Sequence, residues 1–263
     1  ELLVVIVVLG ILMALLLPAF NSVREGARQS VCSNQMRQLG LGLQQYESRN
    51  GAFPAAATGA TSGEFEDSPR YNVLAYILPY LELNYIADIF DMESDWNDTT
   101  NRKDELSEAE LEVFKQRMGF SSNNFSVTNQ RIAGQDAFQF LCSSAPARDG
   151  NVSQGSTTYS YPHAATDYCS AYAIDDDLHS GYTNTHGYEG PEDSFEKGGL
   201  SLNKRLRTSA FKDGLGNTFI LFESAGKPYR YVDGKPYGNA YDTYTQWSNW
   251  KASMKLNPGI QSQ

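Results

Sequence analysis

The first fifty residues carry one long helical pattern of apolar positions. Residues 2–17 have no charged side chain and include thirteen Leu, Ile or Val. From Ala19 onward apolar residues recur every three or four positions, which is the spacing of one face of an amphipathic helix. At Asn50 and Gly51 the sequence offers a C-cap, and Pro54 prevents continuation. The pattern predicts one helix of about fifty residues, apolar on all sides in its first third and on one side afterwards.

The later part of this helix has a single apolar stripe to bury. The stripe consists of Ala19, Val23, Ala27, Val31, Cys32, Met36, Leu39, Leu43 and Tyr46. Inside the apolar third, Gly10 costs about 1 kcal/mol and Pro18 about 3 kcal/mol in helix stability, so we expect a weakened helix between them. Three segments follow from this pattern: an apolar half that either lipid or further copies of the chain must cover (1–20), an amphipathic half of the same helix (21–50) and a globular head (51–263).

The apolar third needs a cover that one head domain does not provide. On an insertion scale, its thirteen branched residues contribute about −6 kcal/mol, against about +3 kcal/mol for Glu1. The segment is therefore expected to enter a bilayer, although its helix of about 24 Å is slightly shorter than a hydrocarbon core of about 30 Å. Either lipid or other copies of the same segment must cover it.

The remaining chain predicts short helices followed by strands. Residues 70–90 form a helical pattern, and a second helix is expected over 104–119, where Ser107 and Glu110 form a capping box. From Phe138 onward the pattern is strand-like, with strands expected at 137–142, 157–162, 217–224 and 229–237. In the last of these, Asp-Gly supplies a hairpin turn between Tyr-rich runs. The sequence therefore predicts an α+β fold, with the long helix packed on an antiparallel β-rich head that has extra short helices and long loops.

The charge distribution favours an acidic outer surface. With 31 acidic and 21 basic residues the net charge is −10, which argues against nucleic acid as a partner. Ten acidic and two basic residues lie between Asp88 and Glu112. We interpret them as a solvated loop and helix face, with a cation site or a repulsive outer surface as alternatives. We expect no cofactor, although calcium, or glycans on Asn97, Asn124 and Asn151 in their N-x-S/T contexts, would be compatible with the sequence.

The sequence contains no recognisable catalytic arrangement. Neither G-x-S-x-G, H-E-x-x-H, a P-loop nor a strand-associated G-x-G-x-x-G occurs. His179 and His186 lie near three aspartates at 175–177, but their spacing in a Gly/Ser/Tyr-rich loop defines no ligand geometry. We therefore expect no enzyme activity, no catalytic residue and no metal site.

The three cysteines allow one disulfide and one free thiol. Cys142 and Cys169 both fall within the predicted β head, so we favour this pair, which closes a loop of about 27 residues and contributes about 3 kcal/mol in the chain-entropy model. The alternative pair is Cys32 with Cys142, which would join the head to the helix.

Four blocks of the sequence resemble the type IV pilin-like proteins. Glu1 in an apolar helix, followed by Gly10 and Pro18, has the spacing of that family's N-terminus. More narrowly, residues 1–54 resemble the pilin-like family abundant in planctomycetes, which has a prepilin cleavage and methylation head. The blocks "ILPYLELNYIADIF", "FLCSSAP" and "FKDGLGNTFILFES" resemble later segments of that family, in the same order. Its C-terminal H-x9-D-G module is lacking, because Ala173, Glu189 and Glu196 stand ten places after the three histidines.

The resemblance implies a pilin-like fold and a structural role. The chain would be a major pilin, the subunit of an extracellular type IV pilus-like filament, and Glu1 would pair with the N-terminal amine of a neighbouring subunit. The residues expected in assembly are Glu1, Leu2, Leu3, Val5, Ile6, Leu9, Gly10, Leu12, Leu16, Pro18 and Phe20.

The resemblance also implies partners and a location. The partners would be further copies of the chain, the inner membrane before assembly, a prepilin peptidase and the pilus assembly machinery. The precursor would lie in the inner membrane and the filament at the cell surface. The alternatives are a minor pseudopilin of a type II secretion-like system and a membrane-anchored surface binding module.

Overall fold

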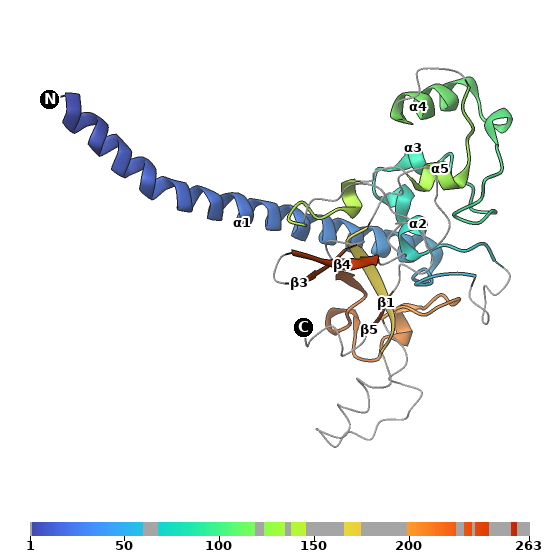
Figure 1. Ribbon diagram of the computed structural model, residues 1–263. Helices are drawn as coiled ribbons and strands as arrows, with labels where there is room; N and C mark the ends of the chain where they lie inside the picture. Colours follow the sequence, from blue (N-terminus) through green and yellow to red (C-terminus); the bar gives the residue numbers. More distant parts are fainter. Residues whose placement is uncertain are drawn as a thin grey trace.

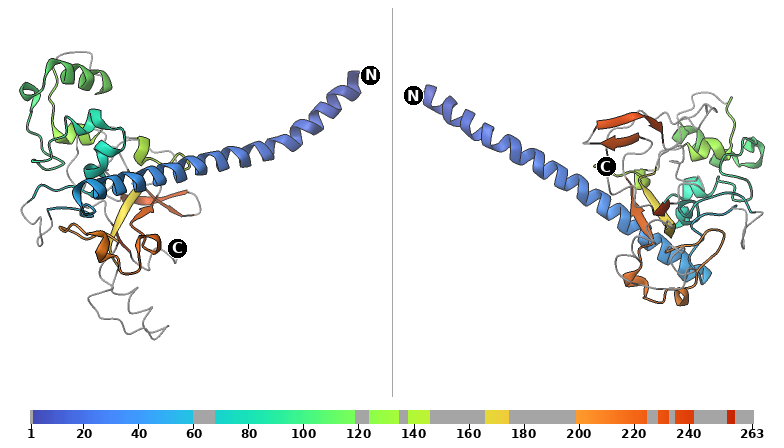
Figure 2. Two further views of the ribbon diagram at one scale, coloured as in Figure 1. Left: turned by 180° about the vertical axis from the view of Figure 1, so that it is seen from behind. Right: turned by 60° about the horizontal axis from the view of Figure 1, so that its bottom comes forward.

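The molecule consists of one long helix with a head domain around its C-terminal half (Figure 1). The computed structural model describes residues 2–59, 68–118, 124–134, 138–145, 166–174, 199–224, 229–232, 235–241 and 254–256. Figure 2 shows from two further sides that the N-terminal half of the helix projects away from the head.

Helix α1 spans Leu2–Asn50 without interruption. Its 49 residues correspond to about 74 Å of helix, and they continue through Gly10 and Pro18 with a gentle curve (Figure 1). The predicted C-cap is confirmed: Gly51 has a φ of +73°, and its N–H donates to the Glu47 carbonyl at 2.7 Å. The Asn50 side-chain amide donates to the Tyr46 carbonyl at 2.8 Å. The single fifty-residue helix is therefore confirmed.

The first predicted helical segment of the head is broken into short pieces. It contains α2 (Val73–Ile77), the 3₁₀ turn η1 (Leu78–Tyr80) and α3 (Asn84–Ala87). The Asn72 side chain caps α2 by accepting from the Leu74 N–H at 2.9 Å. Glu82, in the left-handed region at a φ of 58°, separates η1 from α3.

The second predicted helix is present as α4 (Glu108–Met118). The Ser107 N–H donates to Glu110 Oε2 at 2.8 Å, and the Glu110 N–H donates to Ser107 Oγ at 3.3 Å, so the capping box is confirmed. The predicted C-cap residue, Gly119, lies outside the described residues. Further elements are α5 (Asn129–Ala133) and 3₁₀ turns at Lys103–Glu105, Phe138–Phe140, Thr208–Ala210 and Leu215–Asn217.

Within the described parts of the chain, five strands form two small sheets. β1 (Tyr168–Ile174) lies between β2 (Leu221–Glu223) and β5 (Met254–Leu256), and β3 (Tyr229–Val232) pairs with β4 (Lys235–Tyr241). The β3–β4 and β1–β2 pairs are antiparallel, as expected.

Two strand predictions are wrong. β1 and β5 are parallel, so the head is not purely antiparallel. The apolar run at 137–142 contains the 3₁₀ turn Phe138–Phe140 instead of a strand. The predicted strand at 157–162 and the Asp-Gly turn at 233–234 lie outside the described residues. The α+β class holds, with less strand than expected in the described parts of the head.

The core forms where the head covers the last turns of α1. Leu39 and Leu43 are almost fully buried, and they belong to one cluster with Leu74, Ile77 and Tyr168. The predicted stripe is correct from Cys32 onward. It is wrong at three earlier positions, because Val23 and Val31 are 71% and 44% exposed and Ala27 is exposed, and the Ala19 side chain lies outside the described residues. The head reaches α1 only from its middle onward, so the first half of the stripe has no intramolecular cover among the described residues.

Candidate functional site

The described side chains in the first part of the projecting half of α1 form an exposed apolar surface. We call residues 2–20 of α1 the apolar rod. Nine of its large apolar side chains are 50–66% exposed: Val4, Val5, Ile6, Val7, Ile11, Leu12, Met13, Leu16 and Phe20. Covering what remains exposed of these side chains is worth on the order of 10 kcal/mol. A surface of this kind marks an interaction site, because a monomeric protein in water rarely presents so much contiguous apolar area.

The structure places most of the predicted assembly residues on this rod. Val5, Ile6, Leu12, Leu16 and Phe20 are exposed, and a Cβ added at Gly10 would meet no atom within 4 Å. The backbone of Leu2, Leu3, Leu9 and Pro18 is helical, while their side chains and the whole of Glu1 lie outside the described residues. The predicted set omitted Val4, Val7, Ile11 and Met13, which the all-round apolar pattern would have supplied.

Among the residues that the structure describes, no helix is both long enough and apolar enough to cross a membrane.

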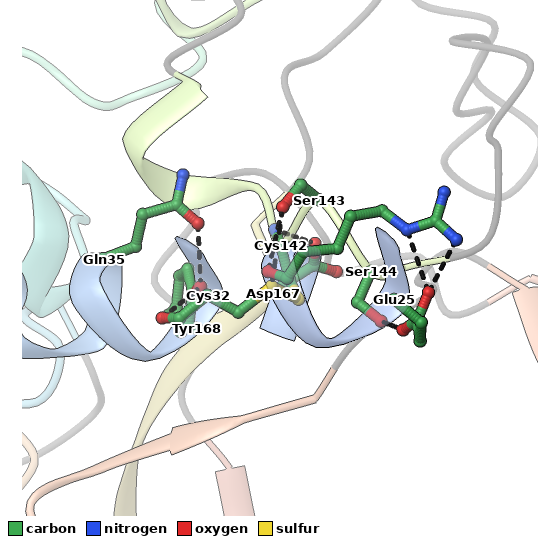
Figure 3. Close-up of a disulfide and its surroundings, with 9 residues drawn as sticks. Glu25, Cys32, Gln35, Cys142, Ser143, Ser144, Asp167 and Tyr168 are labelled. Atoms are coloured by element: carbon green, nitrogen blue, oxygen red, sulfur yellow. Dashed lines mark hydrogen bonds and ion pairs between the residues drawn. A yellow bond between two sulfur atoms is a disulfide. The ribbon is translucent and has the colours of Figure 1, made fainter. Parts of the chain in front are cut away.

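Along α1, the first hydrogen bond from the described residues of the head is at Glu25, about one turn beyond the rod. Ser144 Oγ donates a hydrogen bond to Glu25 Oε1, and Arg28 forms an ion pair with Glu25 Oε2 at 2.6 Å (Figure 3). Ser143 Oγ donates to the Arg28 carbonyl at 3.2 Å. The hydrogen bond from Ser144, followed by the one from Arg28, lowers the pKa of the Glu25 carboxyl. The sequence did not predict this contact, because it does not indicate which polar residue of the loop lies against which polar residue of the helix.

A disulfide joins Cys32 of α1 to Cys142 of the head, with 4.9 Å between their Cα atoms. The favoured pairing of Cys142 with Cys169 is therefore wrong, and the alternative is observed. Cys169 is buried and not part of the disulfide, and its Sγ lies 3.8 Å from the Phe222 carbonyl oxygen. Because successive strand residues point to opposite faces, and Tyr168 of β1 points toward α1, the side chain of Cys169 points away from it.

Tyr168 and Asp167 hold the head to the helix around this disulfide. The Tyr168 hydroxyl lies 3.2 Å from the Cys32 carbonyl and 3.1 Å from Gln35 Oε1, within hydrogen-bonding distance of both (Figure 3). Asp167 Oδ2 accepts the Cys142 N–H at 2.7 Å. Burial, with the nearby carboxyls of Glu223 and Asp167, raises the pKa of Tyr168, so its hydroxyl stays protonated and able to donate. We call this set of contacts between α1 and the head, from the hydrogen bond at Glu25 to those of the Tyr168 hydroxyl, the junction.

The junction does not form a metal site. Among the described residues, ligand atoms of Cys32, Cys142 and Glu223 lie within 4.8 Å of one another. Both sulfur atoms are in the disulfide, however, and a disulfide sulfur is not the thiolate that a metal binds. His179 and His186 lie outside the described residues.

The acidic segment between Asp88 and Glu112 is tied into the head. Asp95 accepts from the backbone N–H and from Nε of Arg70, both at 2.8 Å, and Asp91 lies 3.8 Å from Arg102. The buried Asn129 amide donates to the carbonyls of Asp91 and Asp95 at 2.8 and 3.0 Å, and of Ser94 at 3.2 Å. These contacts favour the interpretation of the segment as a structural loop. Of the three N-x-S/T positions, Asn124 is exposed, Asn97 is half-buried and Asn151 lies outside the described residues.

Comparison with known proteins identifies the family. Residues 21–261 match the family described as "Protein of unknown function (DUF1559)". Because the match covers most of the chain, the chain belongs to this family, the planctomycete-type pilin-like family that its sequence blocks resemble. No curated protein matches the chain, and no solved structure matches it. The matched segment begins at residue 21, so the rod is not part of it.

Proposed function

We propose that the chain is the structural subunit, or major pilin, of an extracellular type IV pilus-like filament. The observation that carries the proposal is the apolar rod: nine exposed large apolar side chains on a helix whose other half is fixed inside a folded head. A rod whose described apolar side chains are exposed is suited to packing against the same rod of other copies. Membership of a pilin-like family supports this function.

The part of α1 that precedes the junction is long enough for such a packing. Residues 2–24 precede the first junction contact at Glu25, and they correspond to about 34 Å of helix. Side-by-side packing of these helices places the heads on the outside, where the net charge of −10 keeps them soluble. Close contacts between helices must select the register, because transfer from lipid to protein gains little hydrophobic free energy. Gly10, which leaves its surroundings open, allows two backbones to approach there.

Glu1 supplies specificity in this proposal. A carboxylate inside an apolar core costs several kcal/mol unless a cation meets it. Pairing with the N-terminal amine of a neighbouring subunit removes that cost. The pair can form at only one displacement of the two subunits along the filament axis. Location in the inner membrane before assembly, processing by a prepilin peptidase and release at the cell surface belong to the same proposal.

Electron microscopy of sheared surface filaments tests the function. In the organism that encodes the chain, we expect long filaments composed of this protein. Leu12→Asp, in the rod, should abolish them, whereas Phe219→Asp should leave them unchanged, because Phe219 is 77% exposed but lies on the head. Normal filaments from Leu12→Asp would contradict the proposal.

The abundance of the protein in the filament separates the alternatives. A minor pseudopilin would occur as rare copies among other subunits, and a membrane-anchored surface binding module would occur in no filament. Glu1→Leu should prevent or misregister assembly while the chain still inserts into the membrane. Assembly of regular filaments from that variant would refute the pairing of Glu1.

A further inference from the structure

The C-terminal end of α1 borders a hollow that assembly through the rod does not use. The hollow encloses about 320 Å³ and is lined by Tyr46, Arg49, Asn50, Tyr76, Tyr80 and Met92, with further apolar residues between 75 and 90. We call it the tyrosine pocket. Ligand sites of proteins are concave and mostly apolar with a few polar groups, and this volume is at the small end of their range. It suits a ligand of one ring better than an extended chain.

The walls of the pocket are fixed before any ligand arrives. The Tyr46 ring meets Tyr76 and Tyr80 edge to face, with centroids 6.2 and 6.1 Å apart and interplanar angles of 75°. These three residues come from α1, α2 and η1. The Tyr76 hydroxyl donates to Thr58 Oγ1 at 3.2 Å, and burial raises the pKa of Tyr76. A rigid aromatic wall loses little conformational entropy on binding.

Two polar groups of the pocket have no partner within the described parts of the chain. The Arg49 guanidinium is exposed and forms no ion pair or hydrogen bond there, and the Tyr80 hydroxyl forms no hydrogen bond there. Asn50 donates to the Tyr46 carbonyl through Nδ2, which leaves Oδ1 as an acceptor. The pocket therefore combines an apolar aromatic wall with a cation, a hydroxyl and an amide oxygen.

We propose that the tyrosine pocket binds a terminal uronic acid residue of an acidic polysaccharide. A pyranose ring has an apolar C–H face, which fits against tyrosine rings, and a rim of hydroxyl groups, which fits Tyr80 Oη and Asn50 Oδ1. The carboxylate pairs with Arg49, whose planar guanidinium suits bidentate binding of a carboxylate. A neutral sugar would leave Arg49 without a partner.

The proposal does not rest on filament assembly. The pocket lies at the end of α1 opposite to the apolar rod, so binding and assembly can fail separately (Figure 1). The head would then recognise polysaccharide whether the chain is a major pilin, a minor pseudopilin or an anchored module.

Titration calorimetry of the full chain, held in a detergent without a sugar headgroup, tests the site. We expect methyl glucuronide to bind, and methyl glucoside to bind at least about tenfold more weakly, since a charge-assisted hydrogen bond is lost. Arg49→Gln should lower the affinity for the glucuronide about tenfold without changing that for the glucoside. Tyr80→Phe, which removes only the hydroxyl, should weaken both ligands. Arg37→Gln, an exposed arginine of α1 outside the pocket, should change neither.

Four results would overturn the assignment. The first is no binding of the glucuronide by the wild-type chain at millimolar concentration. The second is binding that Arg49→Gln leaves unchanged while the thermal unfolding of that variant is normal. The third is equal affinity for cyclohexanecarboxylate, which would define a carboxylate pocket without sugar recognition. The fourth is self-association that Arg49→Gln abolishes, which would identify a second copy of this chain as the occupant.

Discussion

Cys32 on the long helix and Cys142 in the head, 110 residues apart in sequence, are joined by a disulfide at the point where the head begins to cover the helix. The junction on either side of it contains hydrogen bonds and one ion pair, and the described side chains of the rod before it are exposed. The disulfide therefore lies near the boundary between the half of α1 that is folded into the head and the half whose described side chains are exposed.

Loss of this disulfide should destabilise the head strongly. In the chain-entropy model, a loop of 110 residues contributes about 5 kcal/mol, so we expect Cys142→Ser to lower the free energy of unfolding by about 3–5 kcal/mol. Denaturant unfolding of the detergent-solubilised chain measures the change. Cys169→Ser is the matched control, because Cys169 is buried but forms no disulfide, and its effect should be about 1 kcal/mol. A larger effect at Cys169 than at Cys142, or a Cys142–Cys169 peptide in a non-reducing digest, would contradict the observed pairing.

The helix was predictable because its signals are local. The spacing of apolar residues, the Gly51 cap and the Ser107–Glu110 box each depend on residues within one or two turns, and all three are observed. The apolar rod belongs to the same class of signal. The exposure of the rod was predicted because a single head domain was not expected to cover a helix that is apolar on all sides.

Features that depend on long-range contacts were not predictable. The cysteine pairing required knowledge of which face of β1 points toward α1, and sequence alone does not give that. The burial of Val23 and Val31 was overestimated, because the periodic pattern does not show where the head begins. The turn Phe138–Phe140 was mistaken for a strand, since short apolar runs are ambiguous between the two periods. The tyrosine pocket joins Tyr46 to Tyr80 only through the packing of α1 on η1.

Asn129 should be the main support of the acidic loop. Its side-chain amide donates to three backbone carbonyls between Asp91 and Asp95, and its Oδ1 accepts from the Asp91 N–H at 3.0 Å and from Arg102 at 2.9 Å. Asn129→Ala leaves these buried groups without a partner, so we expect a loss of about 3 kcal/mol in the free energy of unfolding. Asn124→Ala, at an exposed position, should cost less than about 0.5 kcal/mol. Equal unfolding midpoints for the two variants would show that the loop does not depend on Asn129.

The pKa of Glu25 should report on the contact between the loop and the helix. Its value lies below 4.5, chiefly because Ser144 donates to the carboxylate and secondly because Arg28 does. A group whose pKa is lowered in the folded state contributes stability that is present above its unfolded pKa and is lost as the pH falls through the folded value. The junction should therefore weaken as the pH falls below 4.5 and approaches the lowered pKa of Glu25 in the folded protein.

Carboxyl NMR titration of a sample labelled at glutamate measures this pKa directly. Ser144→Ala should move the pKa of Glu25 toward 4.5 by more than Arg28→Gln does, in the order of the two causes. If Ser144→Ala leaves the Glu25 titration unchanged, the hydrogen bond across the junction does not form in solution.

Removal of the residues before the junction should separate folding from assembly. All side chains described between Val4 and Arg24 are exposed, so a chain that begins at Glu25 loses no buried contact among them. We expect this variant to unfold at the same denaturant concentration as the full chain, to remain monomeric by analytical ultracentrifugation without detergent, and to form no filament. A chain that begins at Asn34 also loses Cys32 and the Glu25–Ser144 contact, and it should be less stable by about 3–5 kcal/mol. If the shorter deletion already unfolds the head, the rod is part of the folded domain, and its exposed surface is not reserved for other copies.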